Sequence, residues 1–306
     1  MSLDGNPYAG RHLVVLNPAA GQQDPARVRR QLGGAFAVRG AAFDIVETAG
    51  QGDAERFARR GAELGYRAVV AVGGDGTVGE VITGLAGTDV PLALVPRGTG
   101  NQVAHNLGIP RALDAAVEVA VNGRPVPLDV GQLDDGRYFA LAAGAGLDAE
   151  VIAAATRKMK DRWGFGAYLL AGLRVGVVPR PALYRITADD ETLEVEASMV
   201  LAANVGQFVS PYFPVGVSIG PAVSFSDGLL DVCIFAPRTV TDMAGVLWRV
   251  ASGRYAGDDR MIYLQAREVR IESDPPVVTQ VDGELVGQTP LVARAIAAGA
   301  YVLVPR

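Results

Sequence analysis

The first part of the chain, up to about Pro125, alternates short apolar runs with amphipathic segments. Runs of aliphatic and β-branched residues that end in Gly, Pro or Asn predict strands at residues 12–16, 43–46, 68–72 and 91–95. Between them, apolar residues recur at about every third or fourth position, which predicts helices at residues 25–38, 53–64 and 77–85. This order predicts right-handed crossovers and a mainly parallel sheet covered by helices on both faces. Ligands of such sheets bind at the carboxyl ends of the strands.

The pattern changes near residues 122–127, where the sequence NGRPVP predicts a link between domains. Most later apolar runs are short and strand-like: residues 128–132, 138–143, 183–188, 193–204, 229–235, 261–265, 269–272 and 277–281. The predicted fold class is therefore α/β plus all-β. We expect an α/β domain at residues 1–126, to which residues 293–306 return, and an antiparallel β-sandwich at residues 127–292.

Composition narrows the possible chemistry. The chain has 306 residues with 49% hydrophobic and 20% charged, which is typical of a folded protein of about two domains. The chain has one cysteine, Cys233, and two histidines, His12 and His105. This excludes an internal disulfide and a zinc cluster of His and Cys. A bound metal would therefore take oxygen ligands. A net charge of −5 argues against nucleic acid as a partner.

Two segments bear on membranes. The uncharged stretch at residues 197–226 contains Pro211, Pro214 and Pro221, so we interpret it as buried strands and predict no transmembrane segment. Residues 157–173 place a basic cluster before aromatic and aliphatic residues, which fits either an interfacial membrane helix or a helix packed on its own domain. The chain starts without the pattern of a secretory signal, so the expected compartment is the cytoplasm.

Small-residue loops follow three of the predicted parallel strands. Residues 73–77 (GGDGT) open a helix, and glycines there let backbone N–H groups approach phosphate oxygens near the positive end of the helix. Residues 98–101 (GTGN) follow the next strand, and residues 17–21 (NPAAG) follow the first. Together they predict a polyphosphate site. The alternative is a tight turn that binds no ligand.

Two other nucleotide motifs fit less well. Gly74 to Gly79 matches the dinucleotide pattern G-x-G-x-x-G. Such sites have an acid that binds the ribose at the end of the next strand, where this chain has Pro96-Arg97. An arginine there would suit the 2′-phosphate of NADP. Asp75 would repel a pyrophosphate unless a divalent cation stood between them. The lysines, Lys158 and Lys160, lie outside Gly-rich loops, which excludes a Walker A loop and the protein-kinase strand lysine.

The segments VVAVGGDGTVGEVITGL and LALVPRGTGNQVAHNLGIP resemble the diacylglycerol kinase catalytic family, which includes bacterial lipid kinases, sphingosine kinases and ceramide kinases. The resemblance continues through residues 144–149 (GAGLDA), 226–232 (SDGLLDV) and 280–284 (QVDGE), and so covers nearly the whole chain. It implies that ATP is used to phosphorylate a lipid hydroxyl at a membrane surface, with the nucleotide between an α/β domain and a β-sandwich.

The resemblance also implies roles for individual residues. Asp282 corresponds to the general base and Glu284 to a ligand of Mg²⁺. A second Mg²⁺ would be held by the Asp227 side chain and the carbonyls of Ser224 and Leu229. The residues expected to bind or surround the nucleotide are Asn17, Thr48, Gly73, Gly74, Asp75, Gly76, Thr77, Glu80, Gly98, Thr99 and Asn101.

Asp282 has two interpretations at the level of sequence. On a regular strand, Asp282 and Glu284 would share a face, whereas Gly283 favours a turn in which Asp282-Gly283 closes a hairpin. A carboxylate near the acceptor hydroxyl would accept its proton during phosphoryl transfer.

Departures from the family pattern leave the acceptor open. Gly79 stands where an Asn is common in the bacterial lipid kinases, and Gln102 where an Asp is frequent. The alternatives are an NAD kinase, whose Asn-Glu pair we do not find, an NADP-binding oxidoreductase, and a lipid carrier without catalysis. A free strand edge would allow two copies to pair, so a homodimer is a further hypothesis.

Overall fold

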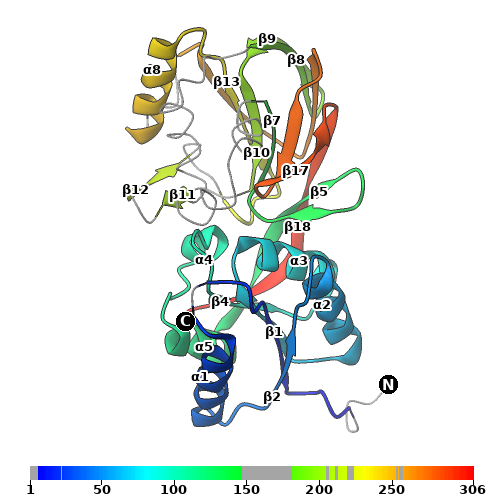
Figure 1. Cartoon of the computed structure of the whole chain (residues 1–306). Coiled ribbons are helices and arrows are strands. Elements are labelled where there is room, and N and C mark those ends of the chain that lie inside the picture. The colour runs from blue at the N-terminus through cyan, green and yellow to red at the C-terminus, as the bar shows by residue number, and fades with distance from the viewer. Residues whose placement is uncertain are drawn as a thin grey trace. The chain divides into compact units, whose positions relative to one another are not determined.

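The computed structural model describes residues 6–21, 23–146, 181–204, 207–210, 213–218, 224–252, 254 and 258–306. The segment 157–173, for which a membrane helix was one interpretation, lies outside these residues. The chain divides into two compact units, Met1–Leu128 with Ala298–Arg306, and Asp129–Ala297 (Figure 1). None of the described helices has the length and apolar content needed to cross a membrane.

The first unit contains the predicted parallel sheet. Its strands lie in the order β2-β1-β3-β4 and all pair in parallel: β1 His12–Leu16, β2 Phe43–Glu47, β3 Ala68–Gly73 and β4 Leu92–Pro96. Every residue of β1, β3 and β4 is buried, whereas β2 at the edge is only half-buried for most of its length. Continuous aliphatic runs form these strands because both faces of the sheet are covered.

Helices cover both faces of this sheet (Figure 1). The strand order shows that β2 lies on one side of β1, and β3 and β4 lie on the other. The crossover from β1 to β2 therefore runs in the opposite direction to those from β2 to β3 and from β3 to β4. Because each crossover is right-handed, the helix between β1 and β2 lies on one face of the sheet and the next two helices lie on the other. Accordingly α1 packs against α5, and α2 packs against α3. The helices are α1 Pro25–Val38, α2 Asp53–Leu64, α3 Asp75–Leu85, α4 Gln102–Asn106 and α5 Leu113–Asn122.

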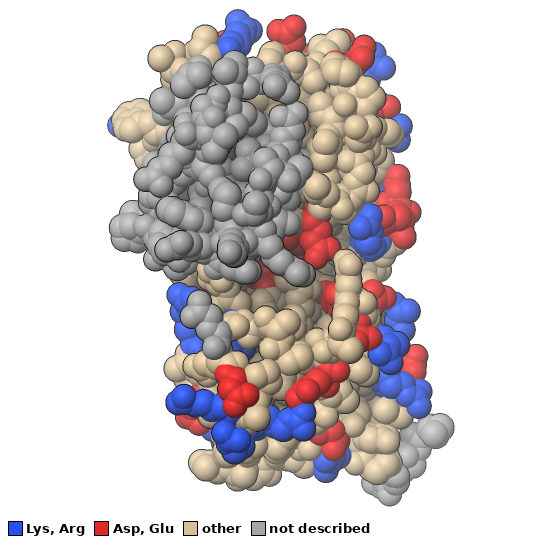
Figure 2. Space-filling model, viewed as in Figure 1, with Lys and Arg blue, Asp and Glu red and all other residues tan. Residues whose placement is uncertain are grey.

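Basic and acidic side chains are interspersed over this unit on the face drawn in Figure 2. Several of them form ion pairs, including Arg39 with Asp114 and Glu118, and Arg60 with Glu63. A nucleic-acid site needs a concentrated basic surface, which this face does not offer.

The second unit is a β-sandwich, as predicted. One sheet has the order β14-β13-β10-β7-β16-β17, and β15, β8 and β9 continue from β18 in the other. Tyr184, Ile186 and Ile271 from one sheet pack with Val200 and Ile234 from the other in a buried apolar cluster. The strands of these two sheets that lie wholly in this unit are β6 Tyr138–Phe139, β7 Ala142–Gly146, β8 Ala182–Ala188, β9 Glu191–Ala197, β10 Met199–Ala203, β13 Leu230–Phe235, β14 Met261–Ala266, β15 Glu268–Asp274, β16 Val278–Val281 and β17 Glu284–Gln288. Two more strands, β5 Arg124–Leu133 and β18 Leu291–Val304, belong partly to each unit.

Some elements differ from the prediction. The run at residues 193–204 is two strands, β9 and β10, which belong to different sheets and meet at the buried Ser198. The run at residues 138–143 likewise divides into β6 and the start of β7. The sequence analysis did not specify α5, α8 (Val240–Ala251), β17 or β18. The hairpin of β11 (Gln207–Ser210) and β12 (Phe213–Ser218) lies within the stretch 197–226, which the sequence predicted to form strands.

Glycine sets the close approach of α2 and α3. A Cβ atom on Gly84 of α3 would lie 2.4 Å from the carbonyl oxygen of Glu55 and 2.8 Å from the Cβ of Ala58, both on α2. No larger residue fits at position 84 without moving one helix. This contact therefore fixes the position of α3, whose first turn carries Asp75, Gly76 and Thr77 of the GGDGT motif.

We expect Gly84→Ala to destabilise the protein by about 1–3 kcal/mol, because the added methyl group overpacks the contact between the helices. Gly34→Ala on α1 is the control, since a Cβ there meets no atom within 4 Å. We expect that change to stabilise the protein by about 0.5–1 kcal/mol, because alanine lowers the entropy lost by a helical residue. Urea denaturation measures both, and equal effects of the two substitutions would contradict the packing argument.

Candidate functional site

The loops after β3 and β4 pack backbone against backbone. A Cβ atom on Gly98 would lie 2.6 Å from the Cα of Gly74, and one on Gly73 would lie 2.5 Å from Thr77 Oγ1. The Arg97 N–H donates to the Gly73 carbonyl at 2.8 Å, in continuation of the pairing between the strands. Glycine is therefore required at position 98 by the contact between the loops, and at position 73 by Thr77 of the same loop.

The loop after β1 joins the same cluster. Asn17 Nδ2 donates to Thr77 Oγ1 at 3.0 Å, and Asn17 Oδ1 accepts from the Ala19 N–H at 3.0 Å. Gly21 has a φ of +79°, and a Cβ atom on it would lie 2.7 Å from the carbonyl oxygen of Arg97. The three small-residue loops predicted from the sequence are thus brought together at one edge of the sheet.

Asp75 supports the loops from within. It is the first residue of α3, and its Oδ1 accepts from the Val103 N–H, in the first turn of α4, at 3.2 Å. Burial raises the pKa of the Asp75 carboxyl, while hydrogen bonds from the backbone N–H groups of residues 101–103 oppose this shift. The carboxylate therefore connects the start of α3 to the start of α4.

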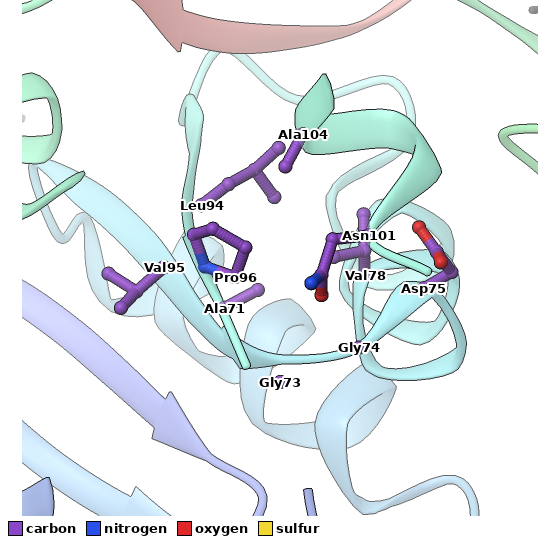
Figure 3. A pocket seen from close by; sticks show the side chains of 10 residues that line it. All are labelled: Ala71, Gly73, Gly74, Asp75, Val78, Leu94, Val95, Pro96, Asn101 and Ala104. Atoms are coloured by element: carbon purple, nitrogen blue, oxygen red, sulfur yellow. The ribbon is translucent and has the colours of Figure 1, made fainter. Parts of the chain in front are cut away.

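Asn101 closes the loop after β4. Its φ is +50°, and its side-chain amide accepts from the Gly98 N–H at 2.8 Å and donates to the Gly98 carbonyl at 2.6 Å. Asp75 and Asn101 supply the polar side chains of a small pocket under the loops, which is otherwise lined by apolar residues and glycine (Figure 3). Gly98, Thr99 and Gly100 are thereby held in a defined turn.

Glu80 connects these loops to the one that contains Thr48. From α3, its two carboxylate oxygens accept from the N–H groups of Gly52 and Ala54, both at 3.0 Å. The Thr48 N–H continues the sheet by donating to the Leu16 carbonyl at 3.0 Å. The predicted nucleotide residues Thr48 and Glu80 therefore belong to one connected group with Gly73 to Thr77.

In the second unit, Asp282 lies in the turn of the hairpin formed by β16 and β17. Asp282 and Gly283 have φ values of +48° and +86°, so the hairpin interpretation of this dipeptide is observed. The Asp282 carboxylate also accepts N–H groups from Ala140 at 3.0 Å, Leu141 at 2.9 Å and Ala142 at 3.0 Å. Its orientation is fixed by the segment that connects β6 to β7. Glu284 is exposed at the start of β17.

The predicted metal loop is anchored by a residue that the sequence analysis did not select. Asp129 is 2% exposed, its Oδ2 accepts from the Gly228 N–H at 2.6 Å, and its own N–H donates to the Phe225 carbonyl at 2.7 Å. Asp227 is exposed, and its Oδ1 accepts from the Leu229 N–H at 3.1 Å. Asp129 thus holds the turn that presents Asp227.

A second buried carboxylate lies close to this loop. Asp231 accepts from Tyr263 Oη and from Gln265 Nε2, while its Oδ2 is buried with no hydrogen-bond partner among the described residues. Burial raises the pKa of the Asp231 carboxyl, and the negative charge of Asp227 adds to the shift.

This environment suits a hard cation. An unsatisfied carboxylate oxygen and a neighbouring acid favour Mg²⁺, and the carboxylate and carbonyl oxygens expected at Asp227, Ser224 and Leu229 are the donors it prefers. A site built from three or more His, Cys, Asp or Glu side chains is not found in the described part of the chain.

Asp129 and Asp231 share a sequence feature that could have identified them. Each is a single carboxylate within an apolar strand. Asp129 follows Leu128 in LDVG, and Asp231 follows Leu230 in LLDV. Charged residues are rarely fully buried unless they have partners, so an acid in such a run indicates a polar contact inside the fold.

Comparison with known proteins places both units in recognised families. The family described as diacylglycerol kinase catalytic domain matches residues 11–133, and the YegS C-terminal NAD kinase beta sandwich-like domain matches residues 142–304. A diacylglycerol kinase of Mycobacterium tuberculosis is 30% identical over 306 residues, covering 97% of this chain and 96% of its own. One of Bacillus subtilis is 29% identical over 286 residues, covering 92% of this chain and 91% of its own.

Another sequence relative and a solved structure also match the chain. An uncharacterized protein of Synechocystis is 30% identical over 241 residues, which is 78% of this chain but 54% of that protein, so the chain spans about half of its length. A solved structure of a Bacillus anthracis protein has a TM-score of 0.81 and 25% identity, and the match covers 96% of this chain and 97% of the other.

Asp75→Asn tests the buried carboxylate that connects α3 to α4. Because the folded pKa is raised, the charge of Asp75 opposes folding at neutral pH, and this effect disappears as the pH falls to the unfolded value of about 3.9. We expect Asp75→Asn to be at least as stable as the wild type at pH 7, and we expect any advantage to shrink at pH 4.5, as measured by urea denaturation.

Asp44→Asn is the control of opposite sign. The Arg11 side chain lowers the pKa of Asp44, so its charge contributes stability at pH 7 that is lost as the pH falls through the folded pKa. We expect Asp44→Asn to be less stable than the wild type at pH 7. An equal loss in Asp75→Asn at that pH would show that the ionised Asp75 stabilises the loops.

Proposed function

The chain belongs to the diacylglycerol kinase catalytic family, and from this premise we propose that it transfers the γ-phosphoryl group of ATP to the hydroxyl of a lipid. Diacylglycerol is the first acceptor to test, since the relatives in Mycobacterium tuberculosis and Bacillus subtilis are named for it. The observation that carries the proposal is the joined set of three loops at the carboxyl edge of the parallel sheet.

The three loops suit a polyphosphate. The first helical turn of α3 leaves backbone N–H groups without helical acceptors, and the helix dipole adds positive potential there. Asp75, Asn101 and Glu80 direct their side chains into hydrogen bonds that hold the loops, so the loop geometry is set before a ligand binds. Gly73, Gly74, Gly76, Thr77, Gly98 and Thr99 are the residues we assign to the phosphates.

Asp282 is the residue we assign to the acceptor hydroxyl. As the lipid oxygen forms its bond to the γ-phosphorus, the bond from that phosphorus to the β–γ bridging oxygen breaks and ADP leaves. The hydroxyl proton goes to the Asp282 carboxylate, which hydrogen bonds from Ala140, Leu141 and Ala142 hold in one orientation.

Bound Mg²⁺ would supply positive charge that stabilises the phosphoryl oxygens. We assign Glu284 to the ion that acts with ATP. A second ion would be held by the Asp227 carboxylate with the carbonyls of Ser224 and Leu229, close to the unsatisfied Asp231 Oδ2.

The base assignment is tested with Asp282→Asn. Asparagine tolerates positive φ and keeps a hydrogen-bond acceptor, but it does not take up the proton, so we expect kcat to fall about 10²- to 10⁴-fold. The assay follows labelled phosphate from Mg²⁺-ATP to diacylglycerol, monoacylglycerol, sphingosine, ceramide, undecaprenol and phosphatidylglycerol in detergent micelles, with NAD as a separate acceptor.

Asp189→Asn is the matched control. Asp189 also lies in a hairpin turn with a φ of +49°, and its carboxylate also accepts backbone N–H groups, from Arg267 and Glu268. We expect this variant to keep activity within a few-fold of the wild type. Equal loss of activity in both variants, with equal loss of thermal stability, would assign Asp282 a structural role only. Labelling of NAD, or of no acceptor, would contradict lipid phosphorylation.

The second metal site is tested without catalysis. If Mg²⁺ binds the loop around Asp227 in the folded protein, millimolar MgCl₂ should raise the melting temperature of the wild type in the absence of nucleotide. We expect Asp227→Asn to lose this rise and Asp190→Asn, an exposed acid of the turn between β8 and β9, to keep it. The same rise in all three proteins would remove Asp227 from the site.

A further inference from the structure

The loops at the carboxyl edge of the parallel sheet contain a single basic residue. The segments that follow the four strands, at residues 17–24, 48–52, 74 and 97–101, include Arg97 and no other lysine or arginine. ATP carries up to four negative charges on its phosphates, whereas backbone N–H groups offer only partial positive charge. Arg97 is therefore the one full positive charge that these loops contain.

The backbone of Arg97 is fixed between two of the loops. Its N–H donates to the Gly73 carbonyl at 2.8 Å, and its carbonyl oxygen lies 2.7 Å from the position of a Cβ atom on Gly21. Arg97 Nη2 lies 3.9 Å from the same position. The guanidinium group thus lies beside the loop after β1, within the joined set of loops.

The guanidinium has an unsatisfied donor. Arg97 Nε is buried and has no hydrogen-bond partner among the described residues, and Arg97 forms no ion pair with any of them. By contrast, Arg29 of α1 pairs with Glu47, and Arg56 of α2 pairs with Asp53. A buried N–H group normally has an acceptor, so an acceptor from a ligand is the simplest explanation.

We propose that Arg97 binds the terminal phosphates of ATP. This rests on the proposed function and adds to it a residue that the GGDGT and GTGN motifs do not contain. The planar guanidinium presents parallel N–H donors that match two phosphate oxygens. Arg97 is then the residue by which the loops distinguish a nucleoside polyphosphate from an uncharged nucleoside.

The test measures the affinity of the full-length protein for Mg²⁺ with a non-hydrolysable ATP analogue, for ADP and for adenosine, by isothermal titration calorimetry. We expect Arg97→Ala to weaken binding of the ATP analogue about 10- to 100-fold, as loss of charge-assisted hydrogen bonds does, and to leave adenosine binding unchanged. Arg97→Lys keeps the charge but loses the paired donors, so we expect an intermediate loss. Thermal melting of each variant shows whether it is folded.

Arg124→Ala is the matched control. Arg124 is exposed and comes two residues after the end of α5. The last turn of α5 contacts Arg67, which comes directly before β3, through the Val121 carbonyl. Arg124 therefore lies near the amino ends of the strands, away from the loops at their carboxyl ends. We expect it to bind all three ligands as the wild type does. If Arg97→Gln, which keeps much of the side-chain stem, binds the ATP analogue as tightly as the wild type, the proposal is overturned while the proposed function stands.

Two further outcomes also overturn it. An equal loss for adenosine and for the ATP analogue would show that Arg97 supports the loops and does not recognise phosphate. A wild-type protein that binds none of the three ligands would remove both this inference and the use of ATP in the proposed function.

Discussion

The contact between the loops after β3 and β4 is the constraint on which the rest of the site depends. Gly74 and Gly98 meet backbone to backbone, and Asp75 crosses from one loop to the helix after the other. A side chain at either glycine would push the loops apart and remove the geometry that gathers their N–H groups. The close packing of α2 on α3 through Gly84 holds the same helix from its other end.

Much of this arrangement follows from the sequence. Continuous aliphatic runs identify β1, β3 and β4, because only strands covered on both faces are apolar throughout. Helices α1 and α2 are predicted to the residue, since Asp24 and Pro25 begin the first and Gly65 ends the second. Local rules suffice where a turn residue and a hydrophobic period agree.

The destinations of polar side chains could not be predicted in this way. Asp75 lies in a motif that suggests contact with a ligand, yet its carboxylate is buried against α4. The Asp282 carboxylate accepts hydrogen bonds from residues about 140 positions earlier in the chain. Such contacts depend on which strands become neighbours, and no local pattern specifies that. The break between β9 and β10 at Ser198, where the chain changes sheet, was missed for the same reason.

The cap that Glu80 gives to α2 has a consequence for folding. Gly52 precedes α2 with a φ of +83° and has no side chain to cap the helix, so the cap comes from α3, 28 residues further on. The carboxylate that accepts from the N–H groups of Gly52 and Ala54 at the start of α2 is therefore supplied by another helix. These two hydrogen bonds form only once α3 has docked, so they couple the start of α2 to the packing of the second and third βα units of this sheet.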